Sequence, residues 1–181
     1  MSDSIKHECG VALLKLHKPL QYYIDKYNKP TFGLDKMYLL MEKQRNRGQD
    51  GSGIAIVRRD TEFGNDFIYR ERSAESNSLQ RIFENCYKQY NKLNPEKLND
   101  ANYLKENCEV FGDIFLGHLR YGTHGDLSEK VCHPFYRKSN WITRNLVLAG
   151  NFNLTNVDDL LQNLIQLGQH PRQKADTVLV L

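Results

Sequence analysis

Short apolar segments of strand length, separated by segments with helical periodicity, constrain the fold of this chain more than any other feature. The strand candidates are residues 10–16, 53–57, 67–72, 114–119 and 145–149. The last two each lead directly into a polar turn that contains glycine, which is where chemistry is expected to sit.

Helical spacing of apolar residues occurs in three other places. The first is residues 34–44, and the second is residues 78–107, which Asn94-Pro95 divides into a longer and a shorter helix. The third begins at Thr155 or Asn156, either of which could cap it, and stops at Gly168. The segment between the first strand and the first helix carries two prolines and three tyrosines and is expected to be an ordered connection.

Composition favours a globular, cytoplasmic protein. The 181 residues are 40% hydrophobic and carry 25 Lys and Arg against 22 Asp and Glu, a balance too even to indicate a nucleic-acid surface. No apolar run approaches the ~20 residues that cross a bilayer, and the opening MSDSIKHE lacks the apolar core of a secretory signal. The four cysteines form no CxxC pair and are expected to be reduced. The apolar ending ADTVLVL suggests a fragment of a longer chain.

Cys9 begins the first strand candidate, directly after the mostly polar leader MSDSIKHE. A cysteine needs a base or a lowered pKa to act as a nucleophile near neutral pH. Removal of residues 1–8 would give Cys9 a free α-amino group, whose pKa is ordinarily about 7.7–8.0, as a base on the same residue. The alternative is a small apolar cysteine at the start of a buried strand.

Arg120 directly follows the strand candidate 114–119, within GHLRYGTHG. Its planar guanidinium could bind a carboxylate through two hydrogen bonds, or it could form a surface ion pair. Thr123 and His124 could add hydrogen bonds to the same ligand, although His124 also fits a simple turn. The histidines show no spacing typical of metal ligands, so no metal site is expected.

The turn AGNFN follows the strand candidate 145–149. The side-chain amide of Asn151 and the backbone N–H of Phe152 could point the same way, and two converging donors make an oxyanion hole. An asparagine in such a position is also ordinary turn chemistry.

The local pattern of RGQDGSG is typical of the C-terminal end of a helix, where a glycine stops the helix. Gln49 and Asp50 would then be turn residues. It is not a nucleotide-binding loop, because the spacings GxGxxG and GxxxxGK are both absent.

Taken in order, CGV, RGQDGSG, GHLRYGTHG with a later HPF, and NFNLTN resemble the N-terminal-nucleophile (Ntn) glutaminase domain of class II glutamine amidotransferases. In that family a cysteine exposed by processing begins a buried strand. The resemblance covers residues 9–181, without a matching motif between about residues 60 and 110, and it makes residues 1–8 a leader. It implies an α+β fold of four αββα layers with mostly antiparallel sheets.

The resemblance also implies the roles of particular residues. Cys9 would be the nucleophile with its α-amino group as the base, and Asn151 with the N–H of Phe152 would form the oxyanion hole. Arg120 would bind the α-carboxylate of glutamine and Asp176 its α-ammonium group. Further residues that would line the pocket are Arg47, Gly48, Tyr121, Thr123 and His124.

The implied activity is hydrolysis of L-glutamine to glutamate and ammonia. RGQDGSG and NLTN favour the member of the class that opens de novo purine synthesis, which would also use phosphoribosyl pyrophosphate and form a homo-oligomer. That partner, and Mg²⁺, would belong to a phosphoribosyltransferase domain too large for 181 residues, and no cofactor is expected in the glutaminase domain. RYGTHG leaves glucosamine-6-phosphate synthase as an alternative. A non-catalytic glutamine-binding module is a third, because Phe152 stands where the family has glycine and would be strained if the turn required positive φ.

Overall fold

A computed structural model describes residues 8–122, 128–171 and 176–181. Its strands are β1 (Gly10–Lys15), β2 (Gly51–Val57), β3 (Ile68–Ser73), β4 (Ile114–Arg120), β5 (Phe135–Arg137) and β6 (Leu146–Leu148). Its α-helices are α1 (Leu20–Tyr27), α2 (Phe32–Glu42), α3 (Ser78–Tyr90), α4 (Ala101–Asn107), α5 (Val157–Gln166) and α6 (Asp176–Val180). Short 3₁₀ turns are η1 (Arg45–Arg47), η2 (Pro95–Lys97), η3 (Glu129–Val131) and η4 (Ile142–Arg144).

The strands form two antiparallel sheets. The larger has the order β1-β4-β2-β3, and the smaller pairs β5 with β6. Strand β4 therefore lies between β1 and β2, although residues 58–113 separate β2 from β4 along the chain. The expectation of a mixed helix and strand protein with antiparallel sheets is confirmed.

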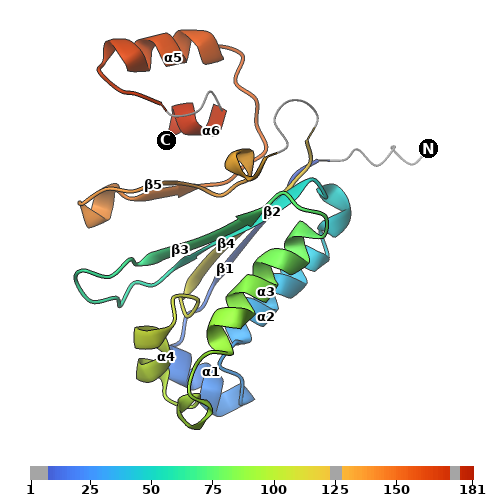
Figure 1. The fold of residues 1–181 in the computed structure, drawn as a ribbon, viewed down its shortest axis with the longest axis vertical. Helices are drawn as coiled ribbons and strands as arrows, with labels where there is room; N and C mark the ends of the chain where they lie inside the picture. Colours follow the sequence, from blue (N-terminus) through green and yellow to red (C-terminus); the bar gives the residue numbers. More distant parts are fainter. Residues whose placement is uncertain (1–7, 123–127, 172–175) are drawn as a thin grey trace.

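The elements are stacked in a fixed order (Figure 1). Helices α2 and α3 cover one face of the four-stranded sheet, and the β5–β6 ribbon lies over the opposite face. Helices α5 and α6 lie beyond the ribbon, and α1 and α4 lie at the end of the sheet where β1 finishes.

The main core lies between the sheet and helices α2 and α3. Leu34, Met37 and Met41 recur at helical spacing on α2 and are almost fully buried. Gly117 of β4 makes room for them, because a Cβ there would lie 2.4 Å from Met37 and 2.5 Å from Met41. Each such buried side chain contributes about 1.5–3 kcal/mol to folding. On β4 the side chains of even number consequently face the β5–β6 ribbon.

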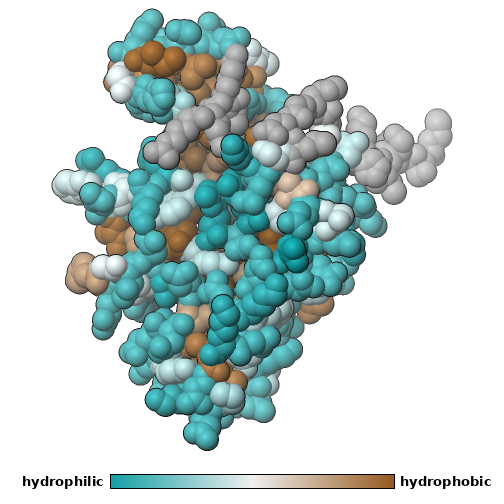
Figure 2. Space-filling view, in the orientation of Figure 1, coloured by the Kyte–Doolittle hydropathy of each residue, from teal (hydrophilic) through white to brown (hydrophobic). Residues whose placement is uncertain are grey.

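Helix α5 contrasts with α2, because none of its residues is buried. Figure 2 shows a mostly hydrophilic face with hydrophobic residues gathered over α5. Among the described residues, no helix has the length and apolar character that crossing a membrane requires.

Three elements differ from the expected organisation. Helix α1 lies within the segment that was expected to be ordered but for which no helix was predicted. Its buried residues are Leu20, Tyr23 and Ile24, and the exposed tyrosines between and after them obscure the helical periodicity. Strand β5 is only three residues long, which is too short for the alternation of apolar and polar residues to predict a strand. The ending DTVLV is rich in β-branched residues and nevertheless forms the short helix α6.

Candidate active site

Cys9 lies directly before β1 and is half-buried. The backbone N–H of Tyr121 donates a hydrogen bond to its Sγ over 3.4 Å. This contact follows from the strand register, since Gly10 pairs with Leu119 and brings the start of β1 beside the end of β4. The fold thus puts Cys9 next to Arg120, the last residue of β4.

The stretch that contains Gly48 and Asp50 wraps around the end of β4. The N–H of Asp50 donates to the carbonyl oxygen of Arg120 over 3.0 Å, and its Oδ2 accepts from the N–H of Gly122 over 2.8 Å. At Gly48 a Cβ would lie 2.6 Å from the carbonyl oxygen of Leu119. Only glycine allows this close approach of two backbones, so Gly48 and Asp50 fix the turn that carries Arg120.

The interpretation of RGQDGSG as a helix stop holds only for the short 3₁₀ turn η1, which Gly48 directly follows. Helix α2 ends at Glu42, and Gly48 has extended backbone angles, with φ −151°. Gly51 and Gly53 lie within β2, on the face covered by residues 132–133. A Cβ at Gly53 would lie 2.0 Å from the carbonyl oxygen of His133. These glycines are needed because a second layer of backbone lies directly on the strand.

Arg47, expected to line the pocket, forms an ion pair with Glu8 over 3.0 Å. Both side chains are about half exposed, 51% and 49%, so the pair contributes little to stability. Glu8 is the residue before Cys9, and Arg47 therefore lies at the edge of the same site. Thr123 and His124 lie outside the described residues.

The turn with Asn151 is joined to β4 through two histidines. His118 Nε2 lies 3.2 Å from the carbonyl oxygen of Gly150, and the N–H of Gly150 donates to His133 Nδ1 over 3.2 Å. The two rings are stacked, with centroids 4.4 Å apart and an interplanar angle of 21°. Because residues two apart on a strand share a face, His118 and Arg120 point to the same side of β4.

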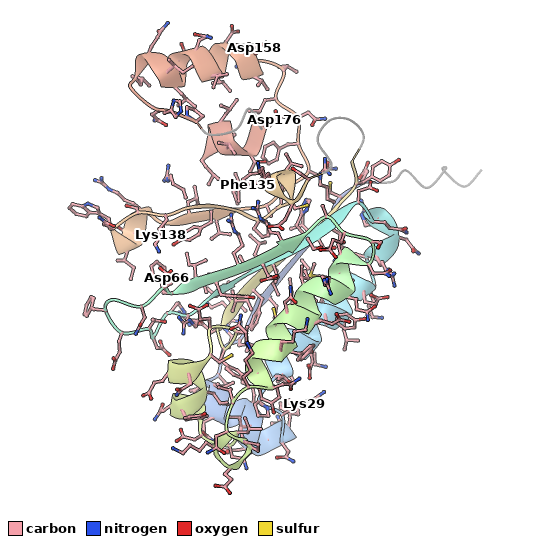
Figure 3. All side chains as sticks on the ribbon, in the orientation of Figure 1. Lys29, Asp66, Phe135, Lys138, Asp158 and Asp176 are labelled. Atoms are coloured by element: carbon pink, nitrogen blue, oxygen red, sulfur yellow. The ribbon has the colours of Figure 1, made fainter. Side chains whose placement is uncertain are left out.

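Asn151 and Phe152 are exposed, and Phe152 is not at positive φ. Among the described residues the non-glycine positions with positive φ are Asn28 and Asn77. The Phe152 backbone is therefore free of the strain expected for a bulky residue in the left-handed region. The turn is held further along by Asp176, whose Oδ2 accepts from the N–H of Leu154 over 2.7 Å. Figure 3 labels Asp176 at the start of α6.

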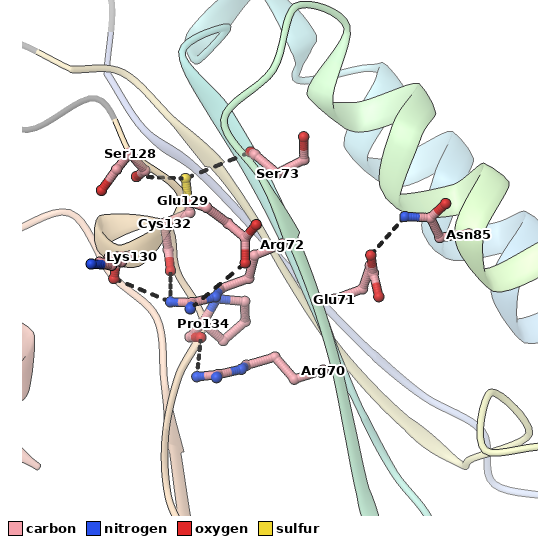
Figure 4. A network of polar contacts seen from close by, with 10 residues as sticks. All are labelled: Arg70, Glu71, Arg72, Ser73, Asn85, Ser128, Glu129, Lys130, Cys132 and Pro134. Atoms are coloured by element: carbon pink, nitrogen blue, oxygen red, sulfur yellow. Dashed lines mark hydrogen bonds and ion pairs between the residues drawn. The ribbon is translucent and has the colours of Figure 1, made fainter.

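Arginines of β3 fasten the segment that carries His133 to the larger sheet (Figure 4). Nη1 of Arg72 donates to the carbonyl oxygens of Cys132 over 2.9 Å and of Lys130 over 3.2 Å. Nη1 of Arg70 donates to the carbonyl oxygen of Pro134 over 3.5 Å. The site therefore lies between two layers that backbone and guanidinium contacts hold together.

Both histidines are kept neutral by their surroundings. Burial, together with the neighbouring His133, lowers the pKa of His118 to about 3. Burial and the positive charges of Arg120 and Arg72 lower the pKa of His133 to about 4. At neutral pH these imidazoles therefore act as hydrogen-bonding groups without charge.

The other three cysteines are buried and all four are free. Burial raises the pKa of the Cys86 thiol to about 12 and also raises that of Cys108, which makes both poor nucleophiles. Among the described residues no group of three or more His, Cys, Asp or Glu side chains could hold a metal ion.

The sequence did not assign roles to Asp50, His118 or His133. Asp50 was expected to be a turn residue only. No role was predicted for the two histidines, although they lie within the motifs GHLRYGTHG and HPF. One signal was present: a histidine in the apolar strand IFLGHLR, on the same face as Arg120, is a buried polar group that needs a partner.

No family model matches the chain. It is similar to an amidophosphoribosyltransferase of Methanocaldococcus jannaschii, with 28% identity over 145 residues, covering 80% of this chain and 25% of the relative. It is also similar to a glutamine–fructose-6-phosphate aminotransferase of Tropheryma whipplei, with 23% identity over 85% of this chain and 20% of the relative. The chain thus spans about a quarter or less of the length of these curated relatives.

Among solved structures, the chain is similar to glutamine phosphoribosylpyrophosphate amidotransferase from B. subtilis, determined in complex with ADP and GMP. The TM-score is 0.54 and the identity 21%, covering 81% of this chain and 25% of that one. This likeness concerns the fold.

The resemblance to class II glutamine amidotransferases is confirmed by these relatives. The chain's relatives that are named amidophosphoribosyltransferase include those of Methanocaldococcus jannaschii and Haemophilus influenzae.

Proposed function

We propose that residues 9–181 form the glutaminase domain of an amidophosphoribosyltransferase, and that residues 1–8 are a leader removed before catalysis. The observation that carries the proposal is the contact of Cys9 with Tyr121, because it sets a cysteine at the start of a strand beside Arg120. A guanidinium that binds the α-carboxylate on the neighbouring strand end would hold a free amino acid amide in place beside the nucleophile.

The reaction follows from the chemistry of these groups. The α-amino group of Cys9 takes the thiol proton, and the thiolate attacks the side-chain amide carbon of glutamine. The tetrahedral oxyanion accepts hydrogen bonds from the Asn151 amide and the Phe152 N–H. The carbon–nitrogen bond breaks, and the α-ammonium group of Cys9 gives a proton to the departing ammonia. Water then attacks the γ-glutamyl thioester and releases glutamate and the thiol.

Substrate recognition would depend on both charges of the amino acid. Arg120 would bind the α-carboxylate and Asp176 the α-ammonium group, with Tyr121, Gly48 and the more distant Arg47 around them. Thr123 and His124 would complete the pocket. Phe152 is compatible with this assignment, since its backbone N–H remains and its φ is not positive.

The layer order supports the finer proposal of an αββα Ntn-hydrolase fold. Helices α2 and α3, the larger sheet, the β5–β6 ribbon, and helices α5 and α6 follow each other in that order (Figure 1). In the whole enzyme the ammonia would react with phosphoribosyl pyrophosphate, bound with Mg²⁺ in a phosphoribosyltransferase domain, to give 5-phosphoribosylamine in the first step of purine synthesis.

A rival proposal is a module that binds glutamine without hydrolysing it. The exposed Phe152 at the position of a family glycine and the Arg47–Glu8 ion pair in the unprocessed chain favour it. A glucosamine-6-phosphate synthase type of enzyme is the alternative within the class, and the relatives include such aminotransferases.

The test is glutamate release by purified protein whose N-terminal residue has been determined. Protein that begins at Cys9 should release glutamate and ammonia in equal amounts, and Cys9→Ala should release neither. Wild type that begins at Cys9 and binds L-glutamine without releasing glutamate would support the binding module instead.

A further inference from the structure

A continuous chain of hydrogen bonds runs from β4 through the candidate oxyanion turn to α6. It passes from His118 Nε2 to the carbonyl of Gly150, and from the N–H of Gly150 to His133 Nδ1. It ends where His133 Nε2 lies 3.1 Å from Thr177 Oγ1. The two stacked rings thus hold the two peptide groups that flank the Gly150 Cα, one through its C=O and the other through its N–H.

The partners fix which nitrogen of each ring carries the proton. A carbonyl oxygen only accepts, so His118 must donate from Nε2. A backbone N–H only donates, so His133 must accept at Nδ1, and a neutral His133 then carries its proton on Nε2 and donates it to Thr177. The low pKa values of both rings, which follow from burial and from the charges of Arg120 and Arg72, agree with this neutral form.

The two ring nitrogens of His133 contact the residues next to Asn151 and to Asp176. Gly150 directly precedes Asn151, whereas Thr177 directly follows Asp176. Thr177 is only 4% exposed, so its hydroxyl meets the ring in a protected place. The stack on His118 and an edge contact with Phe135, at 5.0 Å between centroids, leave the His133 ring little freedom to turn.

The turn is exposed to solvent at residues 151–153, and beyond them the backbone N–H of Leu154 donates to Asp176 Oδ2. The N–H groups that would hold an oxyanion must be aimed before the substrate arrives, because their contribution comes from not having to reorganise. The hydrogen bonds of Gly150 therefore determine the direction of the N–H groups that follow it.

We propose, on the basis of the glutaminase function proposed above, that His133 is a positioning residue for both ends of the glutamine site. Its Nδ1 fixes the oxyanion turn through Gly150, and its Nε2–H fixes Asp176 through Thr177. His118 holds the following peptide group, through the carbonyl oxygen of Gly150. The first link acts on the rate of the chemical step and the second on substrate binding.

Two amide substitutions separate the links. In His133→Asn the side-chain oxygen takes the place of Nδ1, attached at the same carbon, and can still accept from Gly150, but nothing reaches Thr177. In His133→Gln the terminal amide takes the place of Nε2 and can still donate to Thr177, but nothing accepts from Gly150. Thr177→Val is the matched control for the second link. Each variant is made in the full chain and compared with wild type by glutaminase kinetics and by hydrogen exchange of the Gly150 amide.

We expect His133→Gln to lower kcat 10- to 100-fold, with KM within threefold, and to speed exchange of the Gly150 amide at least tenfold. His133→Asn should leave kcat within threefold and the Gly150 amide protected, but should raise KM about fivefold or more, as should Thr177→Val. General unfolding would affect both amide variants alike, and melting temperatures measure it.

Equal losses of kcat in the two amide variants, or an unchanged Gly150 exchange rate in His133→Gln, would overturn the proposal. Wild type that shows no glutaminase activity, while Gly150 exchange follows the expected pattern, would contradict the glutaminase function and leave the positioning of the turn by His133 in place.

Discussion

The backbone N–H of Tyr121 donates a hydrogen bond to the Sγ of Cys9 across the boundary between β4 and β1. Residues 112 positions apart in the chain are thereby joined at the site. The contact depends on the geometry of the turn after Arg120, and that turn is held by Asp50.

Asp50→Ala is expected to loosen this turn. It removes the acceptor of the Gly122 N–H, and losing a hydrogen bond to a charged group destabilises by about 1.5–3 kcal/mol. We expect a KM for glutamine raised about tenfold, because Arg120 is no longer held. Asp50→Asn keeps an acceptor oxygen and should show less than half of both effects, measured by urea unfolding and by kinetics. Equal effects of the two variants would argue against the hydrogen bond as the cause.

Gly53→Ala is expected to destabilise the contact between the two layers. The new Cβ would lie 2.0 Å from the His133 carbonyl oxygen, a backbone atom that cannot turn aside. We expect a loss of ~3 kcal/mol or more in the free energy of unfolding, since overpacking against flexible side chains already costs about 1–3 kcal/mol. Gly64→Asn is the control: no atom lies within 4 Å of a Cβ there, and asparagine tolerates positive φ, so its loss should stay below ~1 kcal/mol. Similar melting temperatures of the two variants would contradict the layered packing.

Asp176 has a structural role, as the acceptor of the Leu154 N–H, and a proposed role in binding the α-ammonium group of glutamine. Two substitutions distinguish these roles. Asp176→Asn keeps an oxygen for the Leu154 N–H but removes the charge, so the melting temperature should stay within a few degrees while KM for glutamine rises at least tenfold. Asp176→Ala should lower both stability and affinity. If Asp176→Asn binds glutamine as wild type does, another residue receives the α-ammonium group.

The stability of the protein should fall with acid in a way that depends on the two histidines. In the unfolded chain a histidine titrates near pH 6.5, whereas in the fold the pKa values are about 3 for His118 and about 4 for His133. Between about pH 6.5 and 4 the unfolded state therefore binds more protons, and the stability present above pH 6.5 is lost as pH falls, by up to ~1.4 kcal/mol per pH unit for each histidine.

The measurement is urea unfolding at pH 7, 6 and 5 for wild type and His133→Asn. Wild type should lose stability more steeply, by up to about 1.4 kcal/mol per pH unit, and more between pH 6 and 5 than between pH 7 and 6. Parallel curves would mean that His133 is not held neutral in the fold.

The parts of the fold that periodicity reveals were predicted from the sequence. Strands β1, β2, β3, β4 and β6 and helices α2, α3 and α5 lie where apolar spacing indicates, with ends shifted by three residues at most. The neighbour relation of β1 and β4 could not be read from spacing, because pairing between distant strands leaves no local periodicity. The contact of Cys9 with Tyr121 was hidden for the same reason.

The glycines of RGQDGSG show the same limit. A glycine required by another backbone and a glycine that ends a helix look alike in sequence. The distinction appears only when His133 is seen to lie on Gly53 and Leu119 beside Gly48. His118 and His133 gain their roles only from each other and from Gly150, which lies on a third segment.

The most direct test of the central claim is covalent labelling of Cys9. Purified protein is treated with a diazoketone analogue of glutamine, with and without excess L-glutamine, and its intact mass and labelled peptide are determined. We predict a protein that begins at Cys9 and carries one adduct, on Cys9, that L-glutamine prevents; the buried Cys86, Cys108 and Cys132 are internal controls and should stay unlabelled. Folded protein that retains residues 1–8 and carries no adduct on Cys9 would contradict the claim that this cysteine is a working N-terminal nucleophile.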